Sequence, residues 1–275
     1  MGWFTEYWTD HVKLSVRIKK HVFSKETKYQ KIDIYDSYEF GRFMALDGYI
    51  MLTERDEFIY HEMIAHLPMN ANPAIRKVLV IGGGDGGTVR ELLRYPDVVV
   101  DMVEIDEEVV RVCREYLPLT AHAFDNPRVH LMFADGIEYV EKAEKTYDLI
   151  IVDSTDPSGP GLSLYKNEFY KNCQRLLSDE GIFINQHESP YFDDTRASMR
   201  DIHRKLKPLF PIATIYQAFI PTYPSGHWLF GYASKKTHPE FRGDEKLLAS
   251  FKLKYYNKEV HQAAFALPNY VREGL

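Results

Sequence analysis

The sequence predicts an α/β protein in which a small antiparallel β-sheet precedes a parallel, doubly wound sheet. Short strand-like runs occupy the chain before residue 55, and strand-like and helix-like segments alternate from residue 77 onward. A glycine-rich turn at 82–87 stands where the first strand of that alternation meets its helix. Such alternation is typical of a parallel sheet covered by helices on both faces. We place the boundary near residue 70, between an N-terminal β-strand domain with its connecting helix (1–70) and an α/β domain (71–275).

The N-terminal strands are indicated by alternating apolar and polar residues. Residues 12–18 alternate cleanly and residues 29–35 less so. The apolar runs 43–46 and 49–52 flank Asp47-Gly48, which is a hairpin turn signal. Residues 55–67 then have helical spacing, with apolar side chains at 58, 59, 63 and 67 on or near one face. We therefore expect a small antiparallel sheet followed by a helix.

The larger sheet is predicted from the second half of the pattern. Strands are expected at 77–81, 98–104, 128–133, 147–152 and 181–186, and helices at 87–94, 107–116, 136–143, 167–177 and 194–208. Most of the prolines in this part fall between these segments, where proline is tolerated. Two late apolar runs, 212–220 and 227–233, are separated by a turn with two prolines. We expect them to form an antiparallel pair that closes one edge of the sheet.

Composition excludes several classes of function. The chain has 275 residues and a net charge of −6, which argues against a nucleic-acid partner. Its only cysteines, Cys113 and Cys173, form no CxxC pair, so we expect a reducing cytoplasm. No run approaches about 18 apolar residues, so no membrane partner is expected. His61 and His66 are five residues apart and fall off a shared helical face, which argues against a metal.

The turn at 82–87 reads Gly-Gly-Gly-Asp-Gly-Gly. Glycines at a strand-to-helix turn let the backbone approach a ligand closely. Asp85 is the unusual residue, because its carboxylate opposes a pyrophosphate, and no Arg or Lys lies between residues 78 and 89. The turn therefore favours a nucleoside with a cationic group, of the S-adenosyl class, over NAD.

Acidic residues follow four consecutive predicted strands. They are Asp85, Glu104, Asp135 and Asp153, and the carboxyl ends of parallel strands meet at one edge of a sheet. Glu104 comes 20 positions after Gly84, where it can accept the ribose hydroxyl hydrogens. Each acid could instead serve as a helix N-cap, although another acidic residue, at position 106, is better placed than Glu104 for the next helix. Four such acids together favour a nucleoside site.

Two loops indicate a site for an alkyl diamine. Asp153 and Asp156 are three residues apart, and buried ammonium groups require carboxylates. The attacking amine must also lose a proton, since its ordinary pKa is about 10. Asp153 is best placed to accept it and Asp156 to hold an ammonium. Tyr223 lies between two prolines at 221 and 224, although it could equally be a structural tyrosine, and Gln186 ends the strand 181–186 on the same rim.

Taken together, these residues resemble the spermidine synthases, the polyamine aminopropyltransferases. The resemblance covers nearly the whole chain. The stretches that carry it are 46–48, 54–63, 82–87, 103–106, 153–160, 221–226 and 263–268.

The resemblance implies an N-terminal β-domain and a seven-stranded Rossmann-like catalytic domain of the methyltransferase type. It implies decarboxylated S-adenosylmethionine as co-substrate, with no bound prosthetic group and no metal. The donor pocket would comprise Gln30, Gly82, Gly84, Asp85, Glu104, Asp135, Gly136 and Pro160. Asp85 and Asp153 would hold the donor's amino group. The acceptor would be surrounded by Tyr60, His61, Asp153, Asp156, Gln186 and Tyr223, with Asp153 as base assisted by Tyr223.

Two departures from the family pattern leave the acceptor open. Residues 189–192 read Ser-Pro-Tyr-Phe where many relatives have Trp after the Pro, and Gly161 follows Pro160 where Ala is common. Putrescine is expected first, and agmatine, cadaverine or a longer amine could take its place. A methyltransferase or a non-catalytic polyamine-binding protein would also fit parts of the pattern. Residues 158–161 are expected to belong to a lid, and the aromatic N-terminus suggests a homodimer or homotetramer.

Overall fold

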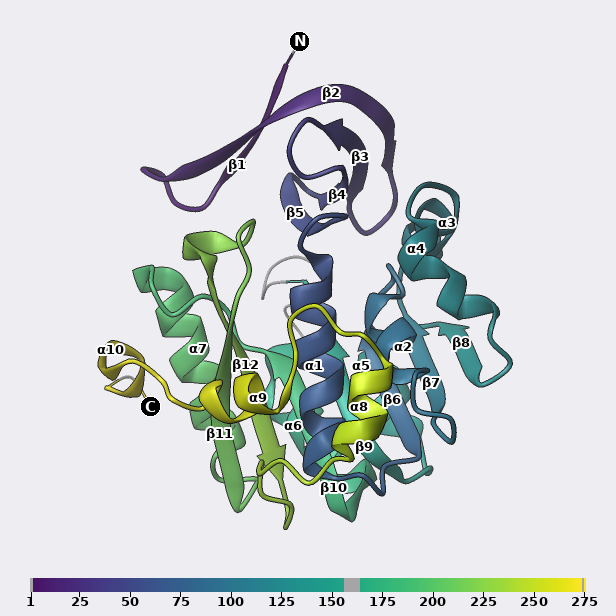
Figure 1. The fold of residues 1–275 in the computed structure, drawn as a ribbon, viewed down its shortest axis with the longest axis vertical. Coiled ribbons are helices and arrows are strands. Elements are labelled where there is room, and N and C mark those ends of the chain that lie inside the picture. Colours follow the sequence, from purple (N-terminus) through teal and green to yellow (C-terminus); the bar gives the residue numbers. More distant parts are fainter. Residues whose placement is uncertain (1, 156–163, 274) are drawn as a thin grey trace.

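The computed structural model describes residues 2–155, 164–273 and 275, and it begins with a five-stranded antiparallel sheet (Figure 1). The strands lie in chain order: β1 (Trp3–Tyr7), β2 (Lys13–Glu26), β3 (Lys31–Ser37), β4 (Arg42–Leu46) and β5 (Tyr49–Thr53). Asp47 and Gly48 both have positive φ, as the predicted two-residue hairpin turn requires. The small sheet is confirmed. Strand β1 was missed, and β2 runs eight residues beyond the predicted end at residue 18.

The second sheet has seven strands in the order β11-β12-β10-β9-β6-β7-β8. The bounds are β6 (Lys77–Gly82), β7 (Val99–Glu104), β8 (Val129–Phe133), β9 (Tyr147–Asp153), β10 (Leu177–Gln186), β11 (Ile212–Phe219) and β12 (His227–Ser234). Strands β8, β7, β6, β9 and β10 pair in parallel, whereas β12 is antiparallel to both β10 and β11. The Rossmann-like sheet and its antiparallel closing pair are confirmed. The strand order reverses between β6 and β9, which is where such sheets bind ligands.

Helices cover both faces of this sheet. The bounds are α1 (Glu57–Ala71), α2 (Gly87–Leu92), α3 (Glu107–Tyr116), α4 (Pro118–Ala121), η1 (His122–Asp125), α5 (Gly136–Lys142), α6 (Asn167–Leu176), α7 (Asp193–Leu206), η3 (Pro224–Gly226), α8 (Glu245–Ser250), α9 (Lys258–Ala263) and α10 (Asn269–Arg272). The pieces α4, η1 and α8 to α10 were not predicted, because segments of four to six residues hold too few turns to show a period. Within residues 2–155 and 164–273, every helix is too short or too polar to cross a bilayer.

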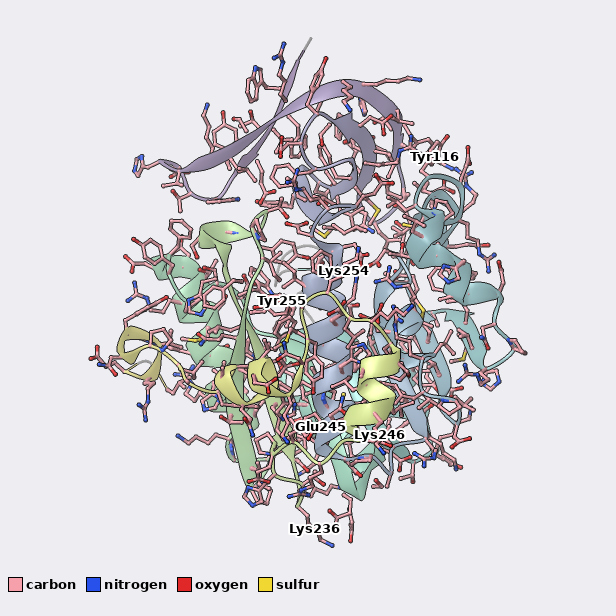
Figure 2. The ribbon with its side chains drawn as sticks, viewed as in Figure 1. Tyr116, Lys236, Glu245, Lys246, Lys254 and Tyr255 are labelled. Carbon is pink, nitrogen blue, oxygen red and sulfur yellow. The ribbon has the colours of Figure 1, made fainter. Side chains whose placement is uncertain are left out.

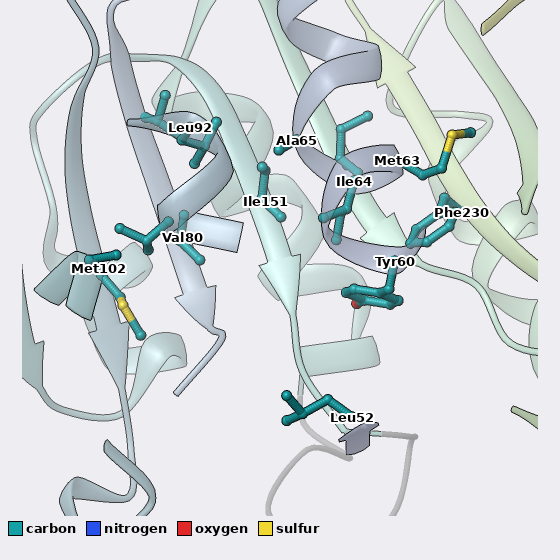
Figure 3. Packing of buried hydrophobic residues seen from close by; sticks show 14 of the residues in the cluster. Leu52, Tyr60, Met63, Ile64, Ala65, Val80, Leu92, Met102, Ile151 and Phe230 are labelled. Atoms are coloured by element: carbon teal, nitrogen blue, oxygen red, sulfur yellow. The ribbon is translucent and has the colours of Figure 1, made fainter. Parts of the chain in front are cut away.

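Alternate residues of the central strands enter different cores. Val78 and Val80 of β6 pack with α1 to α4 and α8, whereas Leu79 and Ile81 pack with α5, α6 and α7. Figure 3 shows part of the first core, in which Ala65 of α1 lies near Ile151 of β9. Because both faces are covered, the strands read as continuous apolar runs in the sequence.

Helix α1 connects the two sheets and is buried on every side from Ile59 to Ala71. The predicted helix is confirmed, and its other faces are buried as well, because the C-terminal segment covers the side of α1 that faces away from the large sheet (Figure 1). The helix ends at Ala71, at the boundary expected near residue 70, and packs against α2. The assignment of domains 1–70 and 71–275 stays a prediction.

Glu62 attaches the C-terminal segment to α1. Its carboxylate accepts three backbone hydrogen bonds, from the N–H groups of Lys254 (2.9 Å), Tyr255 (2.8 Å) and Tyr256 (2.8 Å). Figure 2 shows Lys254 and Tyr255 beside α1. The carboxylate is buried, so these donors have no ready replacement in solvent.

We expect Glu62→Ala to lower the free energy of unfolding by about 3 kcal/mol, because it leaves buried backbone donors unsatisfied. Glu62→Gln keeps one acceptor oxygen and should lose about half as much. Urea unfolding measures both variants, with Glu138→Ala on the surface of α5 as control. Equal midpoints for Glu62→Ala and the control would contradict this role.

Candidate active site

A cavity lies between the N-terminal strands and the carboxyl ends of β6, β7, β9 and β10. Its lining includes every predicted site residue that the structure describes: Gln30, Tyr60, His61, Gly82, Gly84, Asp85, Glu104, Asp135, Gly136, Asp153, Gln186 and Tyr223. Asp156 and Pro160 lie outside the described residues, as does the expected lid at 158–161. The structure thus brings the described residues together, while the role of each stays a prediction.

Neighbouring protein atoms leave no room for side chains at two glycines of the turn. A Cβ on Gly82 would lie 2.1 Å from the backbone oxygen of Asp153, and one on Gly84 would lie 2.9 Å from Oε2 of Glu104. Gly82 also has a φ of +84°, in the left-handed region. Glycine at these two positions therefore allows Asp153 at the end of β9 and Glu104 at the end of β7 to pack directly against the turn.

Asp153 lines the cavity with both carboxylate oxygens hydrogen-bonded. The hydroxyl of Tyr60 donates to Oδ1 (2.8 Å), and the hydroxyl of Thr88 donates to Oδ2 (2.6 Å). Burial and the neighbouring charge of Asp85 raise the pKa of Asp153, although His61 and the two hydroxyls oppose the shift. A raised pKa makes the ionised carboxylate a stronger proton acceptor. Sequence analysis did not identify Thr88 as a site residue. A hydroxyl in the first turn of the helix that follows the glycines is the feature that could have indicated it.

His61 is held as a cation. Its Nδ1 lies 2.5 Å from Oε2 of Glu57, and its Nε2 lies 3.2 Å from Oδ1 of Asp85. Burial alone would lower the pKa of His61, but the carboxylates of Asp85 and Glu57 outweigh it and raise this pKa to about 10. Among the described residues, His61, Asp85 and Asp153 form a group with ligand atoms within 4.8 Å of one another.

Glu104 lies at the end of β7 and is buried in the cavity wall. Its Oε1 accepts a hydrogen bond from the backbone N–H of Asp106 (2.9 Å). Burial and the charges of Asp106 and Asp153 raise the pKa of Glu104 to about 7, against the effect of backbone donors. Asp106 caps α3, as expected, and also accepts hydrogen bonds from Thr27 and from the amide of Gln30. Asp135 likewise caps α5 while lining the cavity.

We expect Glu104→Gln to stabilise the ligand-free protein at high pH while weakening nucleoside binding. An unfolded glutamate loses its proton near pH 4.5, whereas buried Glu104 keeps it to about pH 7, so the parent protein loses stability as pH rises between these values. The variant should therefore gain about 3 kcal/mol at pH 8 and little near pH 5. Urea unfolding at both pH values tests this, with Glu107→Gln on the exposed side of α3 as control. A gain of equal size at both pH values would contradict the ionisation of Glu104 as its cause.

Tyr223 lines the cavity with its hydroxyl anchored to the N-terminal sheet. The hydroxyl donates to the backbone oxygen of Met51 in β5 (2.6 Å), and the ring packs against Trp228, with centroids 4.8 Å apart. These contacts support a structural role for this tyrosine, and its assistance to the base stays a prediction. The amide of Gln186 donates to the hydroxyl of Tyr165 (2.7 Å).

Glu6 is an acidic cavity residue that sequence reasoning missed. It lies on β1, is buried, and accepts a hydrogen bond from the backbone N–H of Ile50 (2.8 Å). The signal was the alternation of residues 3–7, in which Phe4 and Glu6 face inward while Trp3 and Tyr7 are exposed. With Glu6 included, carboxylates from both sheets surround one cavity.

Fold and site together define a Rossmann-like α/β enzyme whose acidic cavity suits positively charged ligands. The spermine/spermidine synthase domain model matches residues 57–243, and the spermidine synthase tetramerisation domain model matches residues 2–54. The chain belongs to the spermine/spermidine synthase family.

Relatives match over nearly their full length. The chain is 55% identical over 279 residues to a polyamine aminopropyltransferase of Clostridioides difficile (strain 630), covering 99% of this chain and 98% of the relative. It is 56% identical over 278 residues to one of Clostridium acetobutylicum, covering 99% and 97%. A crystal structure of a spermidine synthase with the transition state analogue AdoDATO has a TM-score of 0.95 at 42% identity, covering 99% of this chain and 94% of that one. The spermidine synthase of Thermotoga maritima has a TM-score of 0.94 at 42% identity, covering 100% and 94%.

Proposed function

We propose that this enzyme transfers the aminopropyl group of decarboxylated S-adenosylmethionine to putrescine, which gives spermidine and methylthioadenosine. The observation that carries the proposal is the half-buried Asp153 carboxylate, which lies in the same cavity as Asp85 at the reversal of strand order. The site supplies negative charge for two cationic substrates and a proton acceptor for the attacking amine.

The donor would lie along the glycine turn. Glu104 would accept hydrogen bonds from the ribose hydroxyls, Asp135 from the adenine amino group, and Asp85 and Asp153 from the aminopropyl ammonium. The acceptor would enter between Tyr60, Gln186 and Tyr223, which line the cavity on the side of β10 and the N-terminal sheet.

The reaction requires one proton transfer and one displacement. The neutral amine nitrogen attacks the carbon next to the sulfonium in line with the leaving sulfur. A carbon–nitrogen bond forms as the carbon–sulfur bond breaks, and the sulfur leaves as the neutral thioether of methylthioadenosine. Asp153 takes the proton that the amine gives up.

Putrescine is the part of the proposal that needs a direct test. The donor-saturated enzyme is incubated with putrescine, cadaverine, agmatine and spermidine in competition, and the products are identified by mass spectrometry. We expect spermidine and methylthioadenosine to dominate. A larger kcat/KM for another amine would identify that amine, and not putrescine, as the acceptor. Formation of adenosylhomocysteine from S-adenosylmethionine would indicate a methyltransferase instead.

Assembly and location are further parts of the proposal. Trp3 and Tyr7 of β1 are 63% and 62% exposed on the sheet that the tetramerisation model matches, which supports contact between copies of the chain as a homodimer or homotetramer. Cys113 and Cys173 are buried free thiols, which a reducing cytoplasm would preserve.

A further inference from the structure

His61 belongs to a row of alternating charges whose side chains are at most 15% exposed. From the cavity inward, the row runs Asp85, His61, Glu57, Arg90 and Glu91. It passes from the glycine turn through α1 into α2. Only Asp85 and His61 of this row line the cavity.

Arg90 fixes Glu57 with a two-pronged contact. Its two terminal nitrogens donate to the two oxygens of Glu57, at 3.0 Å and 2.9 Å, and its Nε donates to Oε1 of Glu91 at 2.8 Å. Glu91 is 1% exposed and also lies 3.0 Å from Nε2 of His66. A planar guanidinium bound on both edges holds a carboxylate in one orientation, which a lysine cannot do.

The His61 ring packs directly against Gly87. A Cβ on Gly87 would lie 2.2 Å from Cε1 of the ring, so the imidazole occupies the space beside this glycine. The backbone N–H of Gly87 donates to Oδ1 of Asp85 (2.8 Å), the same oxygen that faces Nε2 of His61. The Gly87 N–H and the His61 ring thus hold the same oxygen of Asp85 in position.

We propose that Glu57 and Arg90 are positioning residues, which keep a proton on each nitrogen of His61 and thereby hold Asp85 in place for the donor substrate. An imidazole protonated on both nitrogens can only donate, so its second N–H must go to Asp85. If Glu57 loses its charge, burial favours the neutral ring, and a lone pair can then face Asp85. This inference rests on the proposed function, in which Asp85 holds the amino group of the donor.

In the Glu57→Gln variant, His61 is expected to titrate within the pH range of the activity assay. The parent ring has a pKa of about 10, so it stays charged across the usual assay range. In Glu57→Gln the ring should titrate between about pH 6 and 9, with activity lost as pH rises through that value. The titratable or charged groups around the ring come from its own helix, α2, the glycine turn and the end of β9: Glu57, Tyr60, Arg90, Asp85 and Asp153.

The experiment measures ionisation and kinetics separately. Protein labelled at Cε1 of histidine is titrated by NMR, and the His61 signal is assigned by its loss in His61→Gln. In Glu57→Gln, we expect this signal to titrate in the assay range and kcat/KM for the donor to fall by about 10- to 100-fold at high pH, mainly through KM. The NMR readout does not depend on the reaction, so a failure of the proposed function is distinguishable from a failure of this inference.

Variants of Arg90 and a surface control complete the design. Arg90→Gln removes the bonds that orient Glu57 but also a cation near the ring, so His61 should stay protonated while KM for the donor rises, and Arg90→Lys should recover little because it lacks the fork. Glu245→Gln on the surface of α8 should leave the profile unchanged. The proposal is overturned if His61 stays protonated through the assay range in folded Glu57→Gln. It is equally overturned if Glu57→Gln merely scales the parent profile, or if Arg90→Gln leaves KM for the donor unchanged.

Discussion

Asp153→Asn is expected to lower kcat by about 10²- to 10⁴-fold, which is the usual contribution of a positioned proton acceptor. The asparagine keeps the size of the side chain and can still accept a hydrogen bond from Tyr60 or Thr88, so the cavity should keep its shape. The amide cannot take the proton of the attacking amine at neutral pH. Single-turnover kinetics with saturating donor and amine would isolate this loss from binding.

The control for this variant is Asp179→Asn, which removes an exposed carboxylate that pairs with Lys236 at the opposite end of β10 from the cavity. Its kcat should equal that of the parent enzyme. A second test is the pH profile, since the rise of kcat with pH that Asp153 produces should disappear in Asp153→Asn. A kcat within about threefold of the parent would exclude Asp153 as the base.

Asp85→Asn is expected to reduce the preference for decarboxylated S-adenosylmethionine over S-adenosylmethionine by about 10- to 100-fold. The two donors differ in one carboxylate, which the negative charge of Asp85 repels. The structure adds a reason for a large effect, because His61 lies 3.2 Å from Asp85 as a cation. Without Asp85, this cation would attract the carboxylate of the wrong donor.

A competition assay with both donors measures the preference ratio directly, and it cancels differences in the amount of active enzyme. Asp97→Asn is the matched control, since Asp97 is 70% exposed and pairs with Arg76 at the surface. Equal ratios for Asp85→Asn and the parent would show that discrimination arises elsewhere in the cavity.

The acidic residues of the site could be found in the sequence because each follows a buried strand. Parallel strands deliver their carboxyl ends to one edge, so Asp85, Glu104 and Asp153 had to lie near one another once the alternation was recognised. The pattern alone gave the seven strands of the large sheet and the acids that follow them, whereas the binding roles of Gln30, Tyr60 and His61 came from resemblance to a family. The strand Trp3–Tyr7 was missed although its alternation is present, and with it Glu6 was missed.

The sequence by itself therefore determined the order of strands and helices, the glycine turn and the acids that follow the strands, because these depend on local spacing. Only the tertiary structure decided the partners of those acids. Three hydrogen bonds of the site join residues that lie 33 to 172 positions apart in the chain. They run from Thr88 to Asp153, from Tyr223 to Met51 and from Arg90 to Glu57. The physical reason is that a side chain's charge and orientation depend on burial and on contacting atoms, and packing brings these together from distant parts of the chain.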